Sequence, residues 1–134
     1  MPRLVNIGVG EIVDRLTILA LKILYAGQQG KSADHFEQER NALLTQLRGR
    51  TTMNGLWFEP ALTLGAVNGA LWQTEDKIRE YRIQASAVGY DPAFTNKAIV
   101  QAAFRIQELN DQRAGLVEAI NKLTGDHLGS EKLT

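Results

Sequence analysis

The sequence contains no cysteine, which excludes disulfide bonds and thiolate metal sites. A chain without cysteine fits a reducing compartment, so we predict a cytoplasmic protein. Its 134 residues are enough for a single domain that buries a core of its own.

The chain also lacks an excess of either charge, because fifteen lysines and arginines balance fifteen aspartates and glutamates. No long-range field therefore attracts an anionic partner. A nucleic-acid-binding protein normally presents a basic face, and no stretch of this sequence supplies one. We predict that the protein does not bind nucleic acid.

Long apolar runs are missing as well. The most apolar stretch, Leu16 to Ala26, contains Lys22 and is about half the length that a membrane span requires. The N-terminus, Met1 to Leu4, leads into neither the long apolar core nor the cleavage site of a signal peptide. These absences predict a soluble protein without a membrane partner.

Catalytic and metal-binding signatures are also lacking. His35 and His127 do not stand in a metal-ligand spacing, and the sequence contains no zinc, phosphate-loop or nucleophile-elbow motif. The sequence therefore offers no complete catalytic set, and it points to no required cofactor.

What the sequence does contain is helical periodicity. Apolar residues cover nearly the whole circumference of a predicted helix over residues 10–26, as in a helix that is central or also meets a partner chain. A second helix is predicted to follow Ser32, a good N-cap residue, and to end near Arg48. Its apolar residues lie on one side, so we expect it to cover the bundle.

Two longer helices are predicted over residues 59–88 and 92–124. Pro60 and Pro92 suit their first turns, and each helix carries apolar residues at alternating spacings of three and four. The predicted fold is all-α: an antiparallel bundle of about four helices, in which a short hairpin packs on a long one. Residues 126–134 are expected to form a frayed tail.

The two predicted hairpins differ in length. The longer helices should span ~45 Å each, against ~25 Å for the shorter ones. The long hairpin would then leave apolar surface uncovered at one end. Pairing of two chains through that end, with helix 10–26 contributing, is the simplest way to cover it, so we predict a homodimer.

Three charged residues stand where the helical patterns favour apolar ones: Asp14, Glu75 and Arg113. Arg113 interrupts the apolar seam of helix 92–124, and a guanidinium cannot lose its charge, so it needs carboxylates or carbonyls. Asp14 and Glu75 are the candidates by type and by their own inward positions. We predict a structural ion pair among these residues, which would fix the register of the helices.

The motifs around these charges resemble a family of short bacterial proteins, domain-of-unknown-function family 6165. The matching segments are GEIVDRLTIL at 10–19, VNGALWQTEDKIR at 67–79, NDQRA at 110–114, Ile120-Asn121 and the ending Gly129 to Lys132. The resemblance covers three of the four predicted helices. It implies an all-helical protein without an assigned activity, and it brings no catalytic residues.

The leading interpretation is a small non-catalytic interaction or accessory module that forms a homo-oligomer. It rests on the apolar circumference of helix 10–26, on the unequal hairpins and on the lack of a catalytic set. A second, unidentified protein partner is compatible with this interpretation.

A second interpretation is a magnesium-dependent, all-α enzyme of the nucleotide pyrophosphohydrolase kind. Such enzymes gather carboxylates three or four residues apart, from neighbouring helices, around Mg²⁺. Glu11 and Asp14 have that spacing, and Glu75 with Asp76 could supply the second half. Arg79 stands where the pattern needs another acid, which counts against this interpretation.

A third interpretation is a protein that binds a small anionic ligand, a class that includes chorismate-mutase-like helical enzymes. Arg113 and Arg79 would then bind the anion, and Trp72 would form a wall of the pocket. If Arg113 has two protein carboxylates within hydrogen-bond reach, no ligand is required.

Overall fold

A computed structural model describes residues 7–50, 55–85 and 91–125, apart from the side chain of Phe94. Four α-helices make up most of these residues, and no described residue is in a strand, so the predicted all-α fold is confirmed. The helices are α1 (Val9–Gln28), α2 (Asp34–Arg48), α3 (Phe58–Gln84) and α4 (Pro92–Leu123), with a short 3-10 helix, η1 (Gly55–Trp57), before α3. The predicted frayed tail, 126–134, lies outside the described residues.

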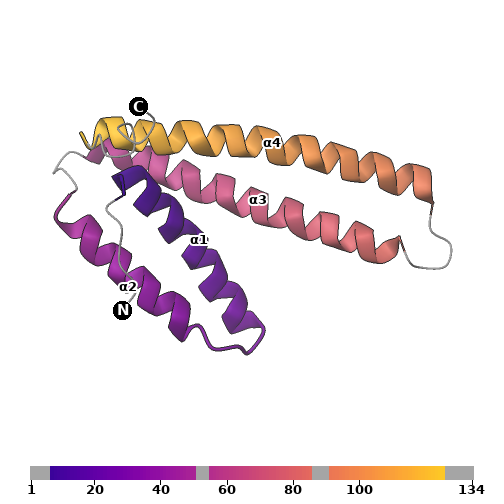
Figure 1. Cartoon of the computed structure of the whole chain (residues 1–134), viewed down its shortest axis with the longest axis horizontal. Helices are drawn as coiled ribbons and strands as arrows, with labels where there is room; N and C mark the ends of the chain where they lie inside the picture. The colour runs from indigo at the N-terminus through magenta and orange to yellow at the C-terminus, as the bar shows by residue number, and fades with distance from the viewer. Residues whose placement is uncertain (1–6, 51–54, 86–90, 126–134) are drawn as a thin grey trace.

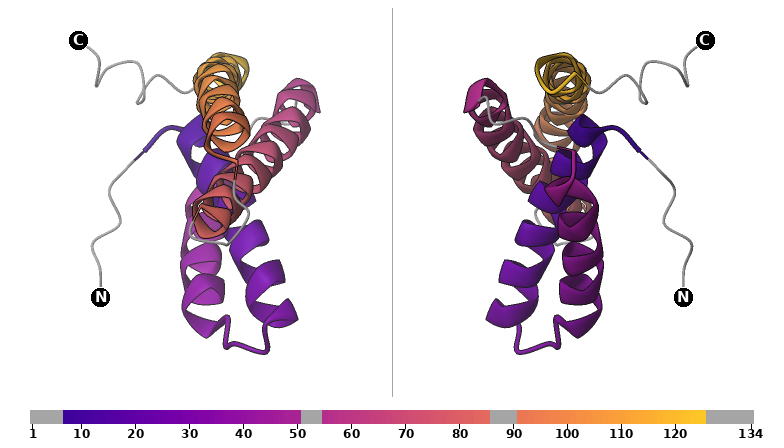
Figure 2. Two further views of the ribbon diagram at one scale, coloured as in Figure 1. Left: turned by 90° about the vertical axis from the view of Figure 1, so that its right-hand side faces the viewer. Right: turned by 90° about the vertical axis from the view of Figure 1, so that its left-hand side faces the viewer.

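The helices form two antiparallel hairpins of unequal length (Figure 1). With 20 and 15 residues, α1 and α2 span ~30 and ~22 Å. With 27 and 32 residues, α3 and α4 span ~40 and ~48 Å. The short hairpin lies at one end of the long one (Figure 1), and the views along the long hairpin show it projecting to one side (Figure 2). Within the described residues, no helix has a stretch that is both long and apolar enough to cross a membrane.

The predicted helix starts agree with the structure to within a residue or two, for local hydrogen-bonding reasons. The Ser32 hydroxyl accepts a hydrogen bond from the backbone N–H of Asp34 at 3.3 Å, although the N-cap itself is Ala33. The Asp91 carboxylate accepts a hydrogen bond from the N–H of Ala93 at 3.1 Å and so caps the first turn of α4. α3 ends at Gln84, earlier than predicted, and the predicted end at residue 88 lies outside the described residues.

The buried apolar residues form three clusters, one within each hairpin and one where the two hairpins meet. α1 packs against α2, α3 and α4, which confirms its predicted central position. One cluster joins α1 to α2, a second joins α1 to the start of α3 and the end of α4, and a third lies between α3 and α4. Their fully buried members are Ile7, Ile12, Leu19 and Leu43, then Val9, Val13, Leu64 and Ile120, and then Val67, Leu71 and Leu109.

The outer part of the long hairpin has no such cluster. We call it the overhang: residues 73–85 of α3 and 91–107 of α4, which project beyond the short hairpin (Figure 1). Thr95 is its one fully buried residue among those whose exposure is described. The α3–α4 pairing therefore continues in the overhang without an apolar core of its own.

Candidate functional site

A buried ion pair links α1 to α4. The Asp14 side chain is 11% exposed, and Arg113 donates hydrogen bonds to both of its carboxylate oxygens. Arg113 Nη2 donates to Oδ2 at 2.6 Å, and Nε donates to Oδ1 at 2.9 Å and to Oδ2 at 3.0 Å. This bidentate geometry is the strongest kind of hydrogen bonding between a guanidinium and a carboxylate.

A third helix joins the pair through Asn68 of α3, which is also buried. Asn68 Nδ2 donates to Asp14 Oδ1 and to Thr17 Oγ1, both at 2.8 Å. The Thr17 hydroxyl in turn donates to the backbone carbonyl of Asp14 at 2.7 Å. The carboxylate of Asp14 thus accepts hydrogen bonds from both α3 and α4, so one residue of α1 fixes its position against both helices of the long hairpin.

The environment of Arg113 favours its charged form. The hydrogen bond to Asp14 raises the pKa of Arg113, partial burial opposes the rise, and the negative charges of Asp14 and Glu75 add to it. With its side chain 35% exposed, Arg113 stays in partial contact with solvent. The guanidinium therefore stays a cation at neutral pH.

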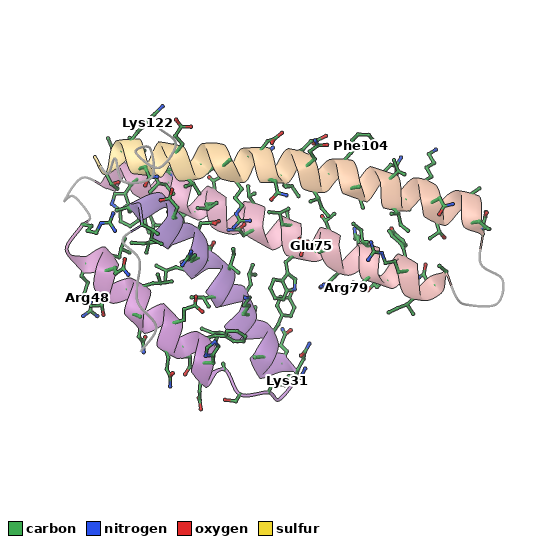
Figure 3. All side chains as sticks on the ribbon, viewed as in Figure 1. Lys31, Arg48, Glu75, Arg79, Phe104 and Lys122 are labelled. Atoms are coloured by element: carbon green, nitrogen blue, oxygen red, sulfur yellow. The ribbon has the colours of Figure 1, made fainter. Side chains whose placement is uncertain are left out.

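Glu75 departs from the expectation that it reaches inward. It is exposed, and it makes no ion pair within 4.0 Å of Arg113, although its charge acts on that residue from a greater distance. Figure 3 shows Glu75 on α3, at the beginning of the overhang. Among the described residues, Arg113 consequently has one carboxylate, Asp14, within hydrogen-bond reach and not two.

A second polar contact ties the start of α1 to the end of α4. The backbone N–H of Gly10 donates to Asn121 Oδ1 at 2.7 Å, and Asn121 Nδ2 donates to both oxygens of Glu11 at 3.3 Å. Gly10 is required for this approach, because a β-carbon there would overlap the backbone carbonyl of Val117. Asn121 is buried, so its side-chain amide accepts the hydrogen bond of a backbone N–H in the first turn of α1 that water cannot reach.

The four carboxylates expected to surround a magnesium ion are not gathered together. Glu11 and Asp14 each bind an amide or guanidinium from another helix, and Asp76 binds Arg79. Within the described residues, no group of three histidine, aspartate or glutamate side chains could hold a metal ion. Glu11 and Asp14, three residues apart in α1, therefore make two separate contacts within the fold.

The expected ligand-binding residues also lie apart. Arg79 is on the surface, 63% exposed, and pairs with Asp76; the hydrogen bond to Asp76 raises the pKa of Arg79. The Trp72 ring stacks on the Tyr25 ring, with centroids 4.9 Å apart and planes 4° from parallel. This stack joins the far end of α1 to α3. Trp72 and Arg79 therefore each already have a partner within the protein.

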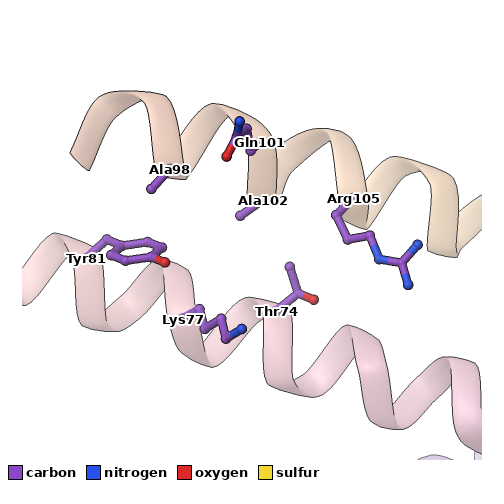
Figure 4. Close-up of a pocket in the computed structure, with 7 residues that line it drawn as sticks. All are labelled: Thr74, Lys77, Tyr81, Ala98, Gln101, Ala102 and Arg105. Carbon is purple, nitrogen blue, oxygen red and sulfur yellow. The ribbon is translucent and has the colours of Figure 1, made fainter. Parts of the chain in front are cut away.

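A groove runs between α3 and α4 in the overhang (Figure 4). It has a volume of about 310 Å³, and its lining contains no carboxylate. α3 contributes Thr74, Lys77 and Tyr81, and α4 contributes Ala98, Gln101, Ala102 and Arg105. None of the three residues expected to bind a ligand lies in it.

Comparison with family models, with curated proteins and with solved structures finds no match. The resemblance to domain-of-unknown-function family 6165 therefore stays a prediction. The fold and the site define an all-α protein of two unequal hairpins, held together by a polar network.

Sequence reasoning missed two features of this arrangement. Asn68 and Asn121 stand beside apolar residues, but an amide on a helix edge usually indicates a solvated face, and only packing reveals these two as buried. The cations Lys77 and Arg105 lie 28 positions apart in the sequence, and only the antiparallel alignment of α3 with α4 brings them to one groove. No local sequence signal identifies either feature.

Proposed function

We propose that the protein is a non-catalytic interaction module that self-associates through the overhang. The observation that carries this proposal is the exposure of large apolar side chains on a segment without a core. Val100 and Phe104 of α4 are 53% and 63% exposed. Contiguous exposed apolar surface is typical of a protein interface.

The α4 residues form a stripe on the outer side of the molecule. Val100 and Phe104 are four residues apart and so share one face of the helix. Figure 3 shows Phe104 on the side of α4 that points away from α3. We call this pair the outer stripe. Ile83 and Leu24 are exposed on other helices and are not part of it.

A second copy of the chain is the partner that fits the outer stripe. If two α4 helices pack antiparallel about a two-fold axis near residue 102, Val100 of each copy faces Phe104 of the other. Lys97 and Glu108 lie on one flank of the stripe, and the same axis places Lys97 of each copy near Glu108 of the other. Opposite charges thus flank the apolar contact, as in antiparallel helix pairs with complementary edges.

The expected strength of dimerisation follows from the small size of the outer stripe. The four apolar side chains, two from each copy, are already partly buried in the monomer, so covering the rest of their surface contributes ~3–7 kcal/mol. Association costs ~4–15 kcal/mol in lost freedom of motion. Because the two terms are of similar size, we expect a dimer that forms with increasing concentration and not a permanent one.

Sedimentation equilibrium from micromolar to millimolar concentration tests the proposal. The mass of the wild-type protein should rise with concentration toward twice the chain mass of 14.8 kDa. Phe104→Glu should remain monomeric, because it places a charge at the centre of the contact. Circular dichroism would verify that the variant keeps its helices.

Leu62→Glu is the matched control. Leu62 is 61% exposed, close to the value for Phe104, but it lies near the start of α3 and far from the overhang. This variant should dimerise like the wild type. A wild-type protein that stays monomeric at millimolar concentration would contradict the proposal, and so would loss of the dimer in Leu62→Glu but not in Phe104→Glu.

A further inference from the structure

The α3–α4 groove brings together two cations from different helices. Lys77 of α3 and Arg105 of α4 both line it (Figure 4). Within the described part of the chain, Lys77 forms no ion pair, and Arg105 forms a long one of 3.6 Å with Glu108, both partners being more than half exposed. Such a surface pair contributes little, so it leaves the charge of Arg105 available.

The remaining polar groups of the groove favour an anion with several oxygens. The Tyr81 hydroxyl makes no hydrogen bond to a described residue and can donate one to a ligand. Gln101 adds an amide donor at the rim. Thr74 uses its hydroxyl proton on the backbone carbonyl of Ala70, at 2.8 Å. With an ammonium, a guanidinium, a phenol and an amide, the lining supplies mainly donors, and no carboxylate competes for them.

The floor of the groove is apolar and narrow. Ala98 and Ala102 are small, so they leave space beside the ring of Tyr81 where larger residues would close the α3–α4 seam. The volume of about 310 Å³ is at the lower end of small-molecule sites. A ligand that fits would combine an oxyanion with one compact apolar group.

We propose that this groove is a binding site for a small phosphate monoester that carries a compact aromatic or apolar group. The dianionic phosphate balances the charges of Lys77 and Arg105, and the apolar group lies on Ala98, Ala102 and the Tyr81 ring. The site lies apart from the outer stripe, because the stripe points away from α3 while the groove opens between α3 and α4; Glu108, which pairs with Arg105, is the residue that the two share.

Phenyl phosphate is the probe for this site. In two-dimensional NMR titrations at constant ionic strength, it should shift the amide resonances of groove residues in a saturable manner at millimolar concentration. Inorganic phosphate should bind the same residues several-fold more weakly, because it lacks the apolar group. The double variant Lys77→Gln with Arg105→Gln should weaken phenyl phosphate binding by about tenfold or more.

Arg82→Gln with Lys122→Gln is the matched control, since it removes one cation from each of the same helices outside the groove. It should bind phenyl phosphate like the wild type. Two results would overturn the proposal: no saturable shift of groove resonances by phenyl phosphate, or equal weakening in both double variants, which would indicate unspecific attraction to positive charge.

Discussion

Asp14 is the residue on which the relative position of the two hairpins depends most. Its carboxylate is buried and accepts hydrogen bonds from Arg113 and Asn68, which belong to two different helices. Removing one partner of a buried pair leaves the other charge without compensation. The pair therefore specifies the position of α1 more than it adds net stability.

Asp14→Ala should lower the free energy of unfolding by ~2–4 kcal/mol, somewhat less than for a fully enclosed pair because Arg113 is partly exposed. Replacing both partners, as Asp14→Leu with Arg113→Met, should recover most of this loss, since no charge is then left alone. Urea denaturation followed by circular dichroism measures both values.

Asp76→Ala is the control for this comparison, because its pair with Arg79 lies on the surface and should contribute nothing measurable. A single variant Asp14→Ala that is as stable as the wild type would contradict the structural role of the pair. So would a double variant that is less stable than Asp14→Ala.

The Asp14–Arg113 pair could be foreseen from the sequence, whereas its surroundings could not. A charge inside an apolar helical seam requires a partner, and few inward carboxylates were available. Glu75 is also an acidic residue beside an apolar seam. A side chain at the edge of a seam can point outward after a small rotation of the helix. The third helix joins the network through Asn68 instead, which donates to Asp14 and does not act as a second acceptor for Arg113.

At the scale of the helices, the close approach of α1 to α4 depends on Gly10. The N–H of Gly10 is hydrogen-bonded to Asn121, and a side chain at this position would collide with the backbone of α4. Gly10→Ala should therefore destabilise the protein by ~1–3 kcal/mol, as expected for overpacking against a rigid backbone. Thermal or urea unfolding of the variant measures the loss.

For Gly69→Ala, in α3, we expect the opposite effect on stability. No atom lies within 4 Å of a β-carbon added at Gly69, so the substitution should stabilise α3 by about 1 kcal/mol. If Gly10→Ala were as stable as the wild type, the tight contact between α1 and α4 would not be a determinant of the fold.

The helices themselves were largely predictable, because periodicity and capping residues act locally. The starts of α2 and α4 follow Ser32 and Asp91, whose side chains accept hydrogen bonds from backbone N–H groups two residues later. The end of α3 was placed too late, since its seam pattern continues beyond Gln84 while the helix does not. Periodicity thus indicates which residues share a face but not where a helix ends.

At the scale of the whole molecule, the residues that stabilise the fold lie in a different part of the unequal hairpins from those that we propose to bind partners. The apolar clusters and the Asp14 network lie outside the overhang, whereas the overhang carries the outer stripe and the groove. The sequence predicted the length difference and the uncovered surface. It could not predict which face of α4 is free, because in the overhang that depends on how α4 packs against α3.

The arrangement of two copies can be measured directly, because the chain has no cysteine and a single introduced cysteine carries one spin label. Asp111→Cys lies on the face of the outer stripe, nine residues from the proposed axis near residue 102. Pulsed electron paramagnetic resonance at high protein concentration should give a distance between the two labels on the order of 30 Å for antiparallel α4 helices. A distance on the order of 10 Å would indicate parallel helices, and the absence of any intermolecular distance would indicate that the copies do not pair through α4; either result would contradict the account.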